Sequence, residues 1–504
     1  MRNVGQATNI EELTSRGVPR SEAEALLGGT LSAWACGDRC QAWRYISQQL
    51  LTPAHPFGVH QLLHQRTFAG WDSAARGPAP VWSPSDEEVG ATNVAAAYGA
   101  DFAAFQRLSV AQPEVFWRAM LTRLGIVQQQ PPAQVIDLSD GVEQPHWMPG
   151  MRLNIAESAL ASGAAAAVVW QAPGGALQRV SRAQLAADVA RFAGALRTLG
   201  LGANDRIAMM MPMSYLSVVG YLSVVSLGAA VVSIADSFAA EEVAVRLRIA
   251  NAAAVLTQDV IVRGEKRLPL YPRVTAAKAP RAIVASAAAA LSMPLRDGDV
   301  SWQQLLAEAP AADVPEYHYA AATHTTNVLF SSGTTGEPKA IAWTQLTPIK
   351  AATDGWAHQD IRRGDVVCWP TNLGWMMGPW LIYASLLNGA TIALYEGSPL
   401  TANFGAFVQR AGVTMLGVVP SLVKAWRRSS CLAGCDWSTI RCFSSTGEVS
   451  SPEQMHWLMA RAGYKPVIEY CGGTEIGGGY ISGSLLQPQL PGAFSTPAVG
   501  CDFV

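Results

Sequence analysis

Charged residues are scarce in this sequence. Asp, Glu, Lys and Arg make up 15% of its 504 residues, and the two signs nearly cancel to a formal net charge of -2. No long run of Lys and Arg occurs, so the chain lacks the basic surface that attracts nucleic acid. Hydrophobic residues account for 50% of the sequence, a fraction typical of globular rather than disordered chains. We therefore expect a globular protein of two or more domains that does not bind nucleic acid.

Cysteine is also scarce. The eight cysteines are scattered along the chain and form no disulfide framework. Cys36 and Cys40, and likewise Cys431 and Cys435, are separated by three residues, but no His or Cys at zinc-finger spacing accompanies either pair. The N-terminus shows no apolar signal-peptide region. These absences predict free thiols in a reducing compartment, which by composition alone is the cytoplasm.

One long stretch, from Ile207 to Ala235, carries no charge at all. A hydropathy window would interpret it as a membrane span. However, Pro212, Gly220 and Gly228 interrupt it, and its texture changes from RIAMMM to SYLSVVGYLSVVSLG to AAVVSIA. Because buried strands of parallel sheets are apolar throughout, we interpret the stretch as a strand, an apolar helix and a second strand. No transmembrane segment is expected.

Alternating strand and helix patterns begin near residue 165. Apolar runs such as RIAMMM and AAVLTQD are separated by helical patterns such as SRAQLAADVARFAGALRTLG, and similar runs recur in ATIALYEG, VTMLGVVP and IRCFSSTG. Repeated units of this kind predict an α/β fold with mostly parallel, helix-covered sheets, which bind ligands beyond the carboxyl ends of their strands. Residues 1–125 differ, since they show helical patches, SEAEALLGGTLSAWA and PEVFWRAMLTRL, and no catalytic spacing.

The segment FSSGTTGEPKAI, residues 330–341, concentrates hydroxyl groups, glycines and one cation after an apolar strand. Gly333 and Gly336 make backbone N–H groups accessible, and Lys339 adds a positive charge. The hydroxyl groups come from Ser331, Ser332, Thr334 and Thr335. This combination suits a polyphosphate. Its spacing differs from that of the Walker A loop, which has four residues between its glycines and a Lys directly after the second, so a P-loop kinase is disfavoured.

These residues closely resemble the phosphate loop of the AMP-forming acyl-CoA synthetases and related adenylate-forming enzymes. Further segments strengthen the resemblance, which is closest to acetyl-CoA synthetase and to plant acyl-activating enzymes of the peroxisomal type: LNIAE, MPM, NLGWMMGPW, LLNGATIALYEGSP, VPS, STGE and GGTEIGG. The resemblance implies an acid–thiol ligase that uses ATP, Mg²⁺ and CoA to activate a carboxylic acid. It also implies a location in the peroxisome.

The family's site residues can be placed on this sequence position by position. The resemblance implies that Thr334, Thr335, Gly336 and Lys339 hold the β- and γ-phosphates of ATP. Thr474 then corresponds to the α-phosphate ligand and Glu475 to the magnesium ligand. Catalytic roles are expected for Thr335, Lys339 and Glu475.

The resemblance also implies a second group of residues, around the adenine and ribose of the nucleotide. Gly447 and Glu448 match the segment that lines adenine and ribose. Many family members have an aromatic residue four positions before the metal-binding Glu, where it faces adenine; here that position is Cys471, and Tyr470 precedes it. A shift of one residue on an extended segment turns a side chain to the other face.

The acyl pocket departs from that of acetyl-CoA synthetase. There a Trp three positions before the metal-binding Glu closes the pocket, whereas this sequence has Gly472. We expect the missing indole to leave room for a medium or longer, or an aryl-bearing, acid. Methionines provide an adaptable apolar wall, and the matching wall residues are Trp375, Met376, Met377, Gly378 and Thr446. Trp375 fits a supporting role and an ordinary core role equally well.

Family members continue past GGTEIGG through a ribose-binding Asp and a hinge into a small C-terminal domain with the adenylation Lys. The sequence given ends before these elements. We therefore expect a helical N-terminal extension, residues 1–125, followed by an adenylation core, residues 126–504, that is truncated before the hinge. Two hypotheses stay open: a fragment of an acyl-CoA synthetase with impaired turnover, or a non-catalytic nucleotide- or acyl-binding remnant. The intact phosphate loop and Glu475 favour the first. No feature predicts the oligomeric state.

Overall fold

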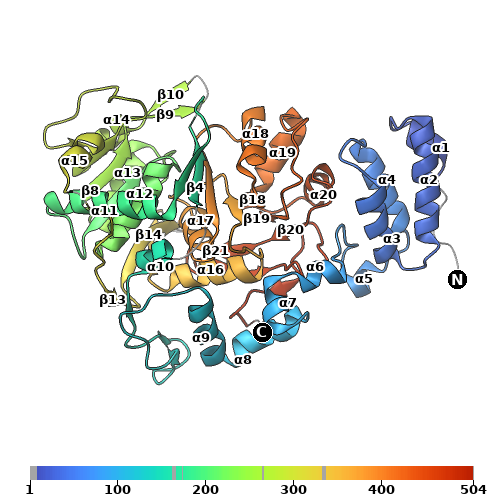
Figure 1. Cartoon of the computed structure of the whole chain (residues 1–504), viewed down its shortest axis with the longest axis horizontal. Coiled ribbons are helices and arrows are strands. Elements are labelled where there is room, and N and C mark those ends of the chain that lie inside the picture. Colours follow the sequence, from blue (N-terminus) through green and yellow to red (C-terminus); the bar gives the residue numbers. More distant parts are fainter. Residues whose placement is uncertain are drawn as a thin grey trace.

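The computed structural model describes residues 8–161, 166–172, 174–263, 266–310, 312–331 and 336–502. Its body contains two seven-stranded sheets, which we call sheet I and sheet II (Figure 1). Sheet I has the order β12-β11-β8-β6-β7-β14-β15, and all its neighbours are parallel except the last pair. Its strands are β6 (Arg206–Met210), β7 (Ala230–Ser233), β8 (Ala254–Gln258), β11 (Arg281–Ala285), β12 (Val300–Ser301), β14 (Thr325–Ser331) and β15 (Lys339–Thr344).

Sheet II has the order β20-β19-β18-β16-β17-β4-β5 and is likewise parallel except for its last pair. The expected α/β fold with mostly parallel sheets is thus confirmed. The strands of sheet II are β4 (Ala166–Gln171), β5 (Gln178–Ser181), β16 (Val366–Cys368), β17 (Thr391–Tyr395), β18 (Met415–Val418), β19 (Cys442–Ser445) and β20 (Val467–Glu469).

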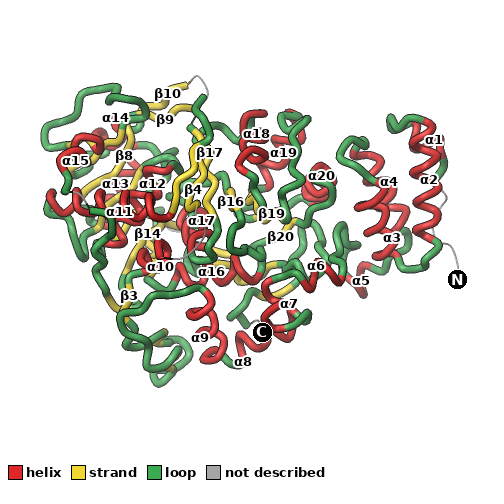
Figure 2. The backbone as a smooth tube through the Cα atoms, viewed as in Figure 1, coloured by secondary structure: helices red, strands yellow, loops and turns green. Residues whose placement is uncertain are grey.

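Helices fill the space between the sheets and cover their outer faces (Figure 2). Helix α12 (Tyr215–Ser226) is buried from its third residue onward, and α17 (Met377–Leu386) along its whole length. Helices that are apolar all round belong inside a core. The strand–helix–strand interpretation of 207–235 is confirmed by β6, α12 and β7, and no helix in the described part of the chain is long and apolar enough to cross a membrane. The other helices of the body are α10 (Ile155–Ala161), α11 (Arg182–Thr198), α13 (Ala240–Ala250), α14 (Tyr271–Ala276), α15 (Trp302–Glu308), α16 (Thr347–Ala357), α18 (Ala402–Ala411), α19 (Pro420–Ser429) and α20 (Pro452–Arg461).

A small antiparallel sheet, β21-β22-β23, follows sheet II in the chain. Its first two strands are joined by the GGTEIGG segment, and its middle strand contacts α16. This sheet carries the predicted metal ligand. It consists of β21 (Cys471–Gly473), β22 (Gly478–Ser482) and β23 (Thr496–Pro497), and three two-stranded ribbons complete the strands: β1 (Ile136–Asp137) with β2 (His146–Trp147), β3 (Arg152–Leu153) with β13 (Ala320–Ala321), and β9 (Val260–Arg263) with β10 (Lys266–Pro269).

The N-terminal part is helical, as the sequence predicts, and α1 to α4 form a lobe at one end of the long axis (Figure 1). The two helical patches named from the sequence correspond to α2 and α9. Helices α7 to α9 lie against the body instead. The helices are α1 (Ile10–Thr14), α2 (Arg20–Trp34), α3 (Arg39–Tyr45), the π-helix η1 (Ile46–Leu50), α4 (Phe57–Thr67), α5 (Ser73–Arg76), α6 (Asp86–Gly90), α7 (Asn93–Tyr98), α8 (Phe102–Ala111) and α9 (Pro113–Arg123).

A cluster of buried rings joins the lobe to α20. We call His55, His60, His64 and His456 the histidine cluster. His60 Nδ1 lies 2.9 Å from the Tyr464 hydroxyl, and the rings of His64 and His456 are 5.1 Å apart. The joint is therefore made of ionisable rings that are held away from water.

Candidate active site

The phosphate-loop segment connects the two antiparallel strands at the edge of sheet I. Ser331 ends β14 and pairs in register with Lys339, the first residue of β15. The expected strand before the loop is confirmed, and a strand also follows it. Lys339 and Gly336 are exposed. The predicted ligands Ser332, Gly333, Thr334 and Thr335 lie outside the described residues.

Residues 474–477 form a turn between β21 and β22, which we call the acidic turn. The backbone N–H groups of Ile476 and Gly477 donate to the Gly473 carbonyl at 3.1 and 3.0 Å. Thr474 is half-buried, and Glu475 is exposed at the tip. The turn therefore presents its carboxylate to solvent on a hydrogen-bonded backbone.

The glycines around the acidic turn are needed for packing. A Cβ on Gly478 would lie 2.6 Å from Asp354 Oδ2, and one on Gly479 would lie 2.5 Å from Tyr470 Cε2. A Cβ on Gly477 would lie 2.0 Å from Thr347 Cγ2. The turn lies directly on α16, and only glycine allows this close approach.

Tyr470 lies in the core rather than at a nucleotide surface. It is 1% exposed, its hydroxyl donates to Asp354 Oδ2 at 2.7 Å, and it accepts a hydrogen bond from Trp380 Nε1 at 3.2 Å. Burial, followed by the Asp354 charge, raises the pKa of Tyr470. Cys471 is half-buried, and its thiol donates to the Tyr480 hydroxyl at 3.0 Å. In this structure the Tyr470 ring is therefore not placed to stack on adenine.

The segment expected to line adenine and ribose follows β19. Thr446 is buried, whereas Gly447 and Glu448 are exposed. The Glu448 carboxylate accepts from the backbone N–H of Ser421 at 2.9 Å and from its hydroxyl at 2.8 Å. Ser421 is the second residue of α19, so Glu448 caps that helix, where a negative charge is favourable. Glu448 thereby fixes the loop after β19 to the start of α19.

The residues expected to form the acyl pocket fall into exposed and buried groups. Trp375 is 54% exposed, with its ring 6.1 Å from that of Phe238, so it is not an ordinary core Trp. Met376 is half-buried, and Met377 and Gly378 are buried at the start of α17. A Cβ on Gly378 would lie 2.4 Å from the Asn372 carbonyl oxygen, so this glycine permits a close backbone contact.

Gly472 does not open space at its own position. A Cβ there would lie 2.0 Å from the carbonyl oxygen of Gly478, because β22 runs alongside. The backbone of β22 therefore occupies the space in which a side chain of residue 472 would begin. The expected room for a medium or longer acid concerns the pocket as a whole and stays a prediction.

A buried network that the sequence reasoning missed supports the acidic turn. Asp354 is fully buried, and its Oδ2 accepts from the Gly479 N–H at 2.8 Å as well as from Tyr470. Its Oδ1 accepts from Lys350, which also donates to the Val499 carbonyl at 3.3 Å. The spacing of Lys350 and Asp354 by one helical turn was the available signal.

His358, one turn further along, ties down residues 483 and 499. Its Nε2 accepts from the Val499 N–H at 3.3 Å, which leaves Nδ1 to donate to the Gly483 carbonyl at 2.8 Å. Burial lowers the pKa of His358 to about 4. The ring is thus neutral near pH 7, and α16 with its C-cap His358 holds the backbone of β22, of the residue after it and of Val499.

The predicted site residues converge from both sheets. Parallel strands β16, β18, β19 and β20 are neighbours in sheet II, so the loops after their carboxyl ends share one edge. The loops after β16 and β19 carry Trp375 and Gly447, and the chain that leaves β20 continues through β21 to Thr474. Trp343 of β15, in sheet I, reaches this edge, because its Nε1 donates to the Thr474 carbonyl at 2.7 Å. The phosphate-loop hairpin and the acidic turn are therefore directly connected.

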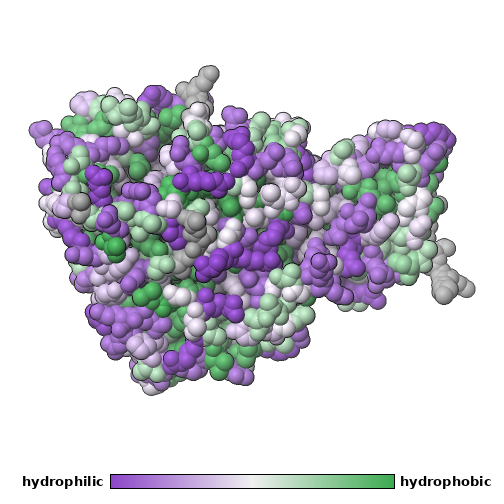
Figure 3. Space-filling model, in the orientation of Figure 1, coloured by the Kyte–Doolittle hydropathy of each residue, from purple (hydrophilic) through white to green (hydrophobic). Residues whose placement is uncertain are grey.

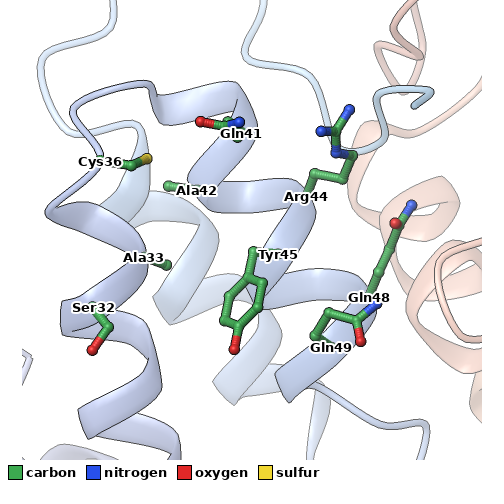
Figure 4. A pocket seen from close by; sticks show the side chains of 9 residues that line it. All are labelled: Ser32, Ala33, Cys36, Gln41, Ala42, Arg44, Tyr45, Gln48 and Gln49. Atoms are coloured by element: carbon green, nitrogen blue, oxygen red, sulfur yellow. The ribbon is translucent and has the colours of Figure 1, made fainter. Parts of the chain in front are cut away.

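A cavity of about 610 Å³ lies elsewhere, in the N-terminal lobe (Figure 4). Helices α2, α3 and η1 line it with neutral polar side chains, Cys36, Tyr45 and one cation, Arg44. This lining lacks the carboxylate and lysine that the phosphate chemistry requires, so we assign no catalysis to it. Hydrophilic and hydrophobic residues are interspersed over the molecular face shown in Figure 3.

The acidic turn, rather than a preformed cage of protein ligands, is the candidate magnesium site. Among the described residues, no group of three or more His, Cys, Asp or Glu side chains could hold an ion. Mg²⁺ usually binds through one or two carboxylates together with substrate phosphates and waters. The exposed carboxylate of Glu475 matches the protein part of this ligand set.

Sequence comparisons agree with this arrangement. A profile of AMP-binding enzymes matches residues 155–503, and a profile of the acetyl-coenzyme A synthetase N-terminus matches residues 102–159. A third profile, the SAM domain of probable acyl-activating enzyme 17/18, matches residues 5–69. The chain belongs to the AMP-binding enzyme family, in the group of AMP-forming acyl-CoA synthetases, which are acid–thiol ligases.

Individual proteins that resemble the chain indicate which members of this group it is similar to. Over 520 residues the chain is 46% identical to hexanoyl-CoA synthase of Cannabis sativa, with 95% of this chain and 71% of that protein covered. Over 490 residues it is 46% identical to probable acyl-activating enzyme 17, peroxisomal, of Arabidopsis thaliana, with 92% and 67% covered. Acetoacetyl-CoA synthetase from Streptomyces lividans shares its fold with a TM-score of 0.75 and 28% identity, over 84% of this chain and 69% of that one.

Proposed function

We propose that this chain activates a carboxylic acid with ATP and transfers the acyl group to CoA. In the first step a carboxylate oxygen attacks the α-phosphorus of ATP, and pyrophosphate leaves. In the second step the CoA thiol attacks the acyl carbon, AMP leaves with the bonding electron pair, and the thiol proton is released. The result is an acyl-CoA thioester.

The contact between Trp343 and Thr474 is the single observation that carries the proposal. It joins the strand that begins at Lys339 to the turn bearing Glu475, which supports assigning a cation and a carboxylate from different sheets to one site. An in-line displacement at phosphorus depends chiefly on positioned groups that neutralise charge.

Each group then has a separate task. Lys339, with Ser331 and Gly336 and the loop residues Ser332, Gly333, Thr334 and Thr335, would hold the β- and γ-phosphates. Thr474 would contact the α-phosphate, and Glu475 would hold Mg²⁺, which would supply positive charge against the phosphates. Gly447 and Glu448 would lie against ribose and adenine, with Cys471 nearby. We omit Tyr470 from this surface because its ring and hydroxyl are engaged in the core.

We propose an acid of medium or greater chain length as the substrate. The name of the Cannabis sativa relative, hexanoyl-CoA synthase, supports this choice. Trp375, Met376, Met377 and Thr446 remain the proposed pocket wall. The peroxisomal name of the Arabidopsis relative supports a peroxisomal location. The division into a helical extension, 1–125, and an adenylation core, 126–504, is part of the proposal.

Isothermal titration of the purified chain with Mg·ATP tests the nucleotide site. We expect Lys339→Ala and Glu475→Gln each to weaken binding about tenfold or more, since a charge-assisted contact contributes about 1.5–3 kcal/mol. Lys266→Ala, which removes an exposed lysine from the β9–β10 ribbon, should bind like the wild type. A folded wild-type chain that binds no Mg·ATP would contradict the proposal and favour a remnant without nucleotide binding.

A further inference from the structure

We infer that Trp343 is a positioning residue that sets the distance between the phosphate-loop hairpin and the acidic turn. The inference rests on the proposed function, because it concerns how that site is held together. Trp343 touches no reacting group in this scheme. It acts through the backbone of Thr474.

The contact is buried and specific. Trp343 is 1% exposed, and its only polar atom, Nε1, donates to the Thr474 carbonyl at 2.7 Å. The two residues lie 131 positions apart in the sequence. The acceptor belongs to the backbone of the residue proposed to contact the α-phosphate, and Glu475 follows directly.

Trp343 shares its strand with the phosphate-binding cation. β15 begins at Lys339 and ends one residue after Trp343, and five of its residues pair in an unbroken register with β14. A displacement of this strand would move Lys339, where the hairpin loop ends. Through the Trp343 indole, a shift of β15 would therefore also shift the acidic turn.

The indole also limits where the turn can lie. A Cβ on Gly477 would lie 3.3 Å from Trp343 Cε2 and Cζ2, in addition to its collision with Thr347. On the other side, Asp354 accepts from the Gly479 N–H at 2.8 Å. The turn is therefore held between Trp343 at its first residue and α16 beneath its last residues.

The chain provides a matched control. Trp43 is also 1% exposed and also donates from Nε1 to a backbone carbonyl, that of Val81, at 2.7 Å. It lies in the N-terminal lobe. Trp43→Phe and Trp343→Phe therefore remove the same kind of hydrogen bond with the same loss of core volume, one far from the site and one within it.

Two measurements on the full chain test the inference. Hydrogen exchange of peptides covering 470–480, without ligand, should speed up in Trp343→Phe and stay at the wild-type rate in Trp43→Phe. Titration with Mg·ATP should show a Kd about fivefold higher for Trp343→Phe only, equivalent to ~1 kcal/mol. If Trp343→Phe leaves both the exchange and the Kd unchanged while the wild type binds Mg·ATP, the inference is wrong. A wild type that fails to bind instead contradicts the proposed function.

A second pair of variants covers the case in which Trp343→Phe does not fold. Gly477 and Gly463 have nearly the same backbone conformation, with φ of +65° and +67°. An added Cβ meets Trp343 and Thr347 at position 477, but nothing within 4 Å at position 463. Gly477→Ala should weaken Mg·ATP binding at least as much as Trp343→Phe, and Gly463→Ala should not. Equal binding by the two glycine variants would contradict the inference.

Discussion

Acidification should loosen the joint between the N-terminal lobe and α20, because the pKa values of His60, His64 and His456 are lowered there. Burial lowers the pKa of His64 from 6.5 to about 4, and the hydrogen bond to the Pro80 carbonyl opposes this shift only in part. Burial and the neighbouring His55 likewise lower the pKa of His60 to about 4. Burial, followed by His64 and His60, lowers the pKa of His456.

The sign follows from the order of protonation. Between pH 6.5 and 4 the unfolded chain binds protons that the folded cluster excludes, so the free energy of unfolding falls as the pH falls. Above pH 6.5 this effect is absent, and below about pH 4 it saturates. Each pKa unit corresponds to about 1.36 kcal/mol, so His64 alone accounts for about 3 kcal/mol across the window. His60 can contribute a similar amount. The sum of the two contributions is a large share of the ~5–15 kcal/mol free energy of unfolding of a typical protein.

The variant His64→Gln isolates one contribution. Gln can keep a donor near the Pro80 carbonyl, which His64 Nε2 contacts at 3.2 Å, but it does not titrate. Urea unfolding at pH 7.5, 6 and 5, followed by Trp fluorescence, should show a shallower pH dependence for this variant. His146→Gln removes a largely exposed histidine and should keep the wild-type dependence. Identical slopes for His64→Gln and the wild type would refute the reasoning.

Other groups around the cluster do not cancel the effect. Glu22 lies 3.2 Å from His55 and faces that ring only. Arg427 lies over the Phe57 ring at 5.0 Å and is itself paired with Glu453 at 2.9 Å. The Tyr464 hydroxyl is neutral over this range, because burial raises its pKa. His60, His64 and His456, whose pKa values are lowered, therefore dominate.

Two further substitutions probe the support of the site. Asp354→Asn removes the buried charge that partners Lys350, so we expect a loss of about 3–5 kcal/mol in urea unfolding; a loss below 1 kcal/mol would show that the pair is not needed. Gly417→Ala places a Cβ 1.8 Å from the Trp369 ring beneath β18. We expect this overpacking to cost about 1–3 kcal/mol or more and to lower the thermal midpoint of unfolding. An unchanged midpoint would contradict this packing.

Local patterns in the sequence identified most of the elements of the body. The change of texture within 207–235 predicted β6, α12 and β7 because apolar runs of strand length are bounded there by Pro and Gly. The hydroxyl- and glycine-rich segment after β14 indicated the proposed phosphate-binding segment for a similar reason. Both signals depend on residues that are close in the sequence, so they can be recognised without the fold.

The partition of strands between sheets was decided by the tertiary structure. β4 comes before β6 in the chain, yet it pairs with β17 of sheet II, more than 200 residues later. Periodicity reports which faces of a strand are buried, not which partner it pairs with. The direction of Tyr470 and the filled space beside Gly472 were hidden for the same reason, since both depend on where β22 and α16 lie.

The proposed site likewise combines residues that could be recognised from the sequence with residues whose roles depend on the tertiary structure. Lys339, Thr474 and Glu475 could be proposed from the sequence, because they lie in short segments that resemble those of the AMP-binding enzymes. Trp343 and Asp354 belong to no such segment, and their roles arise only when β15 and α16 pack against the acidic turn. Chemistry was thus determined by local sequence, and its positioning by contacts between residues that only the folded chain brings together.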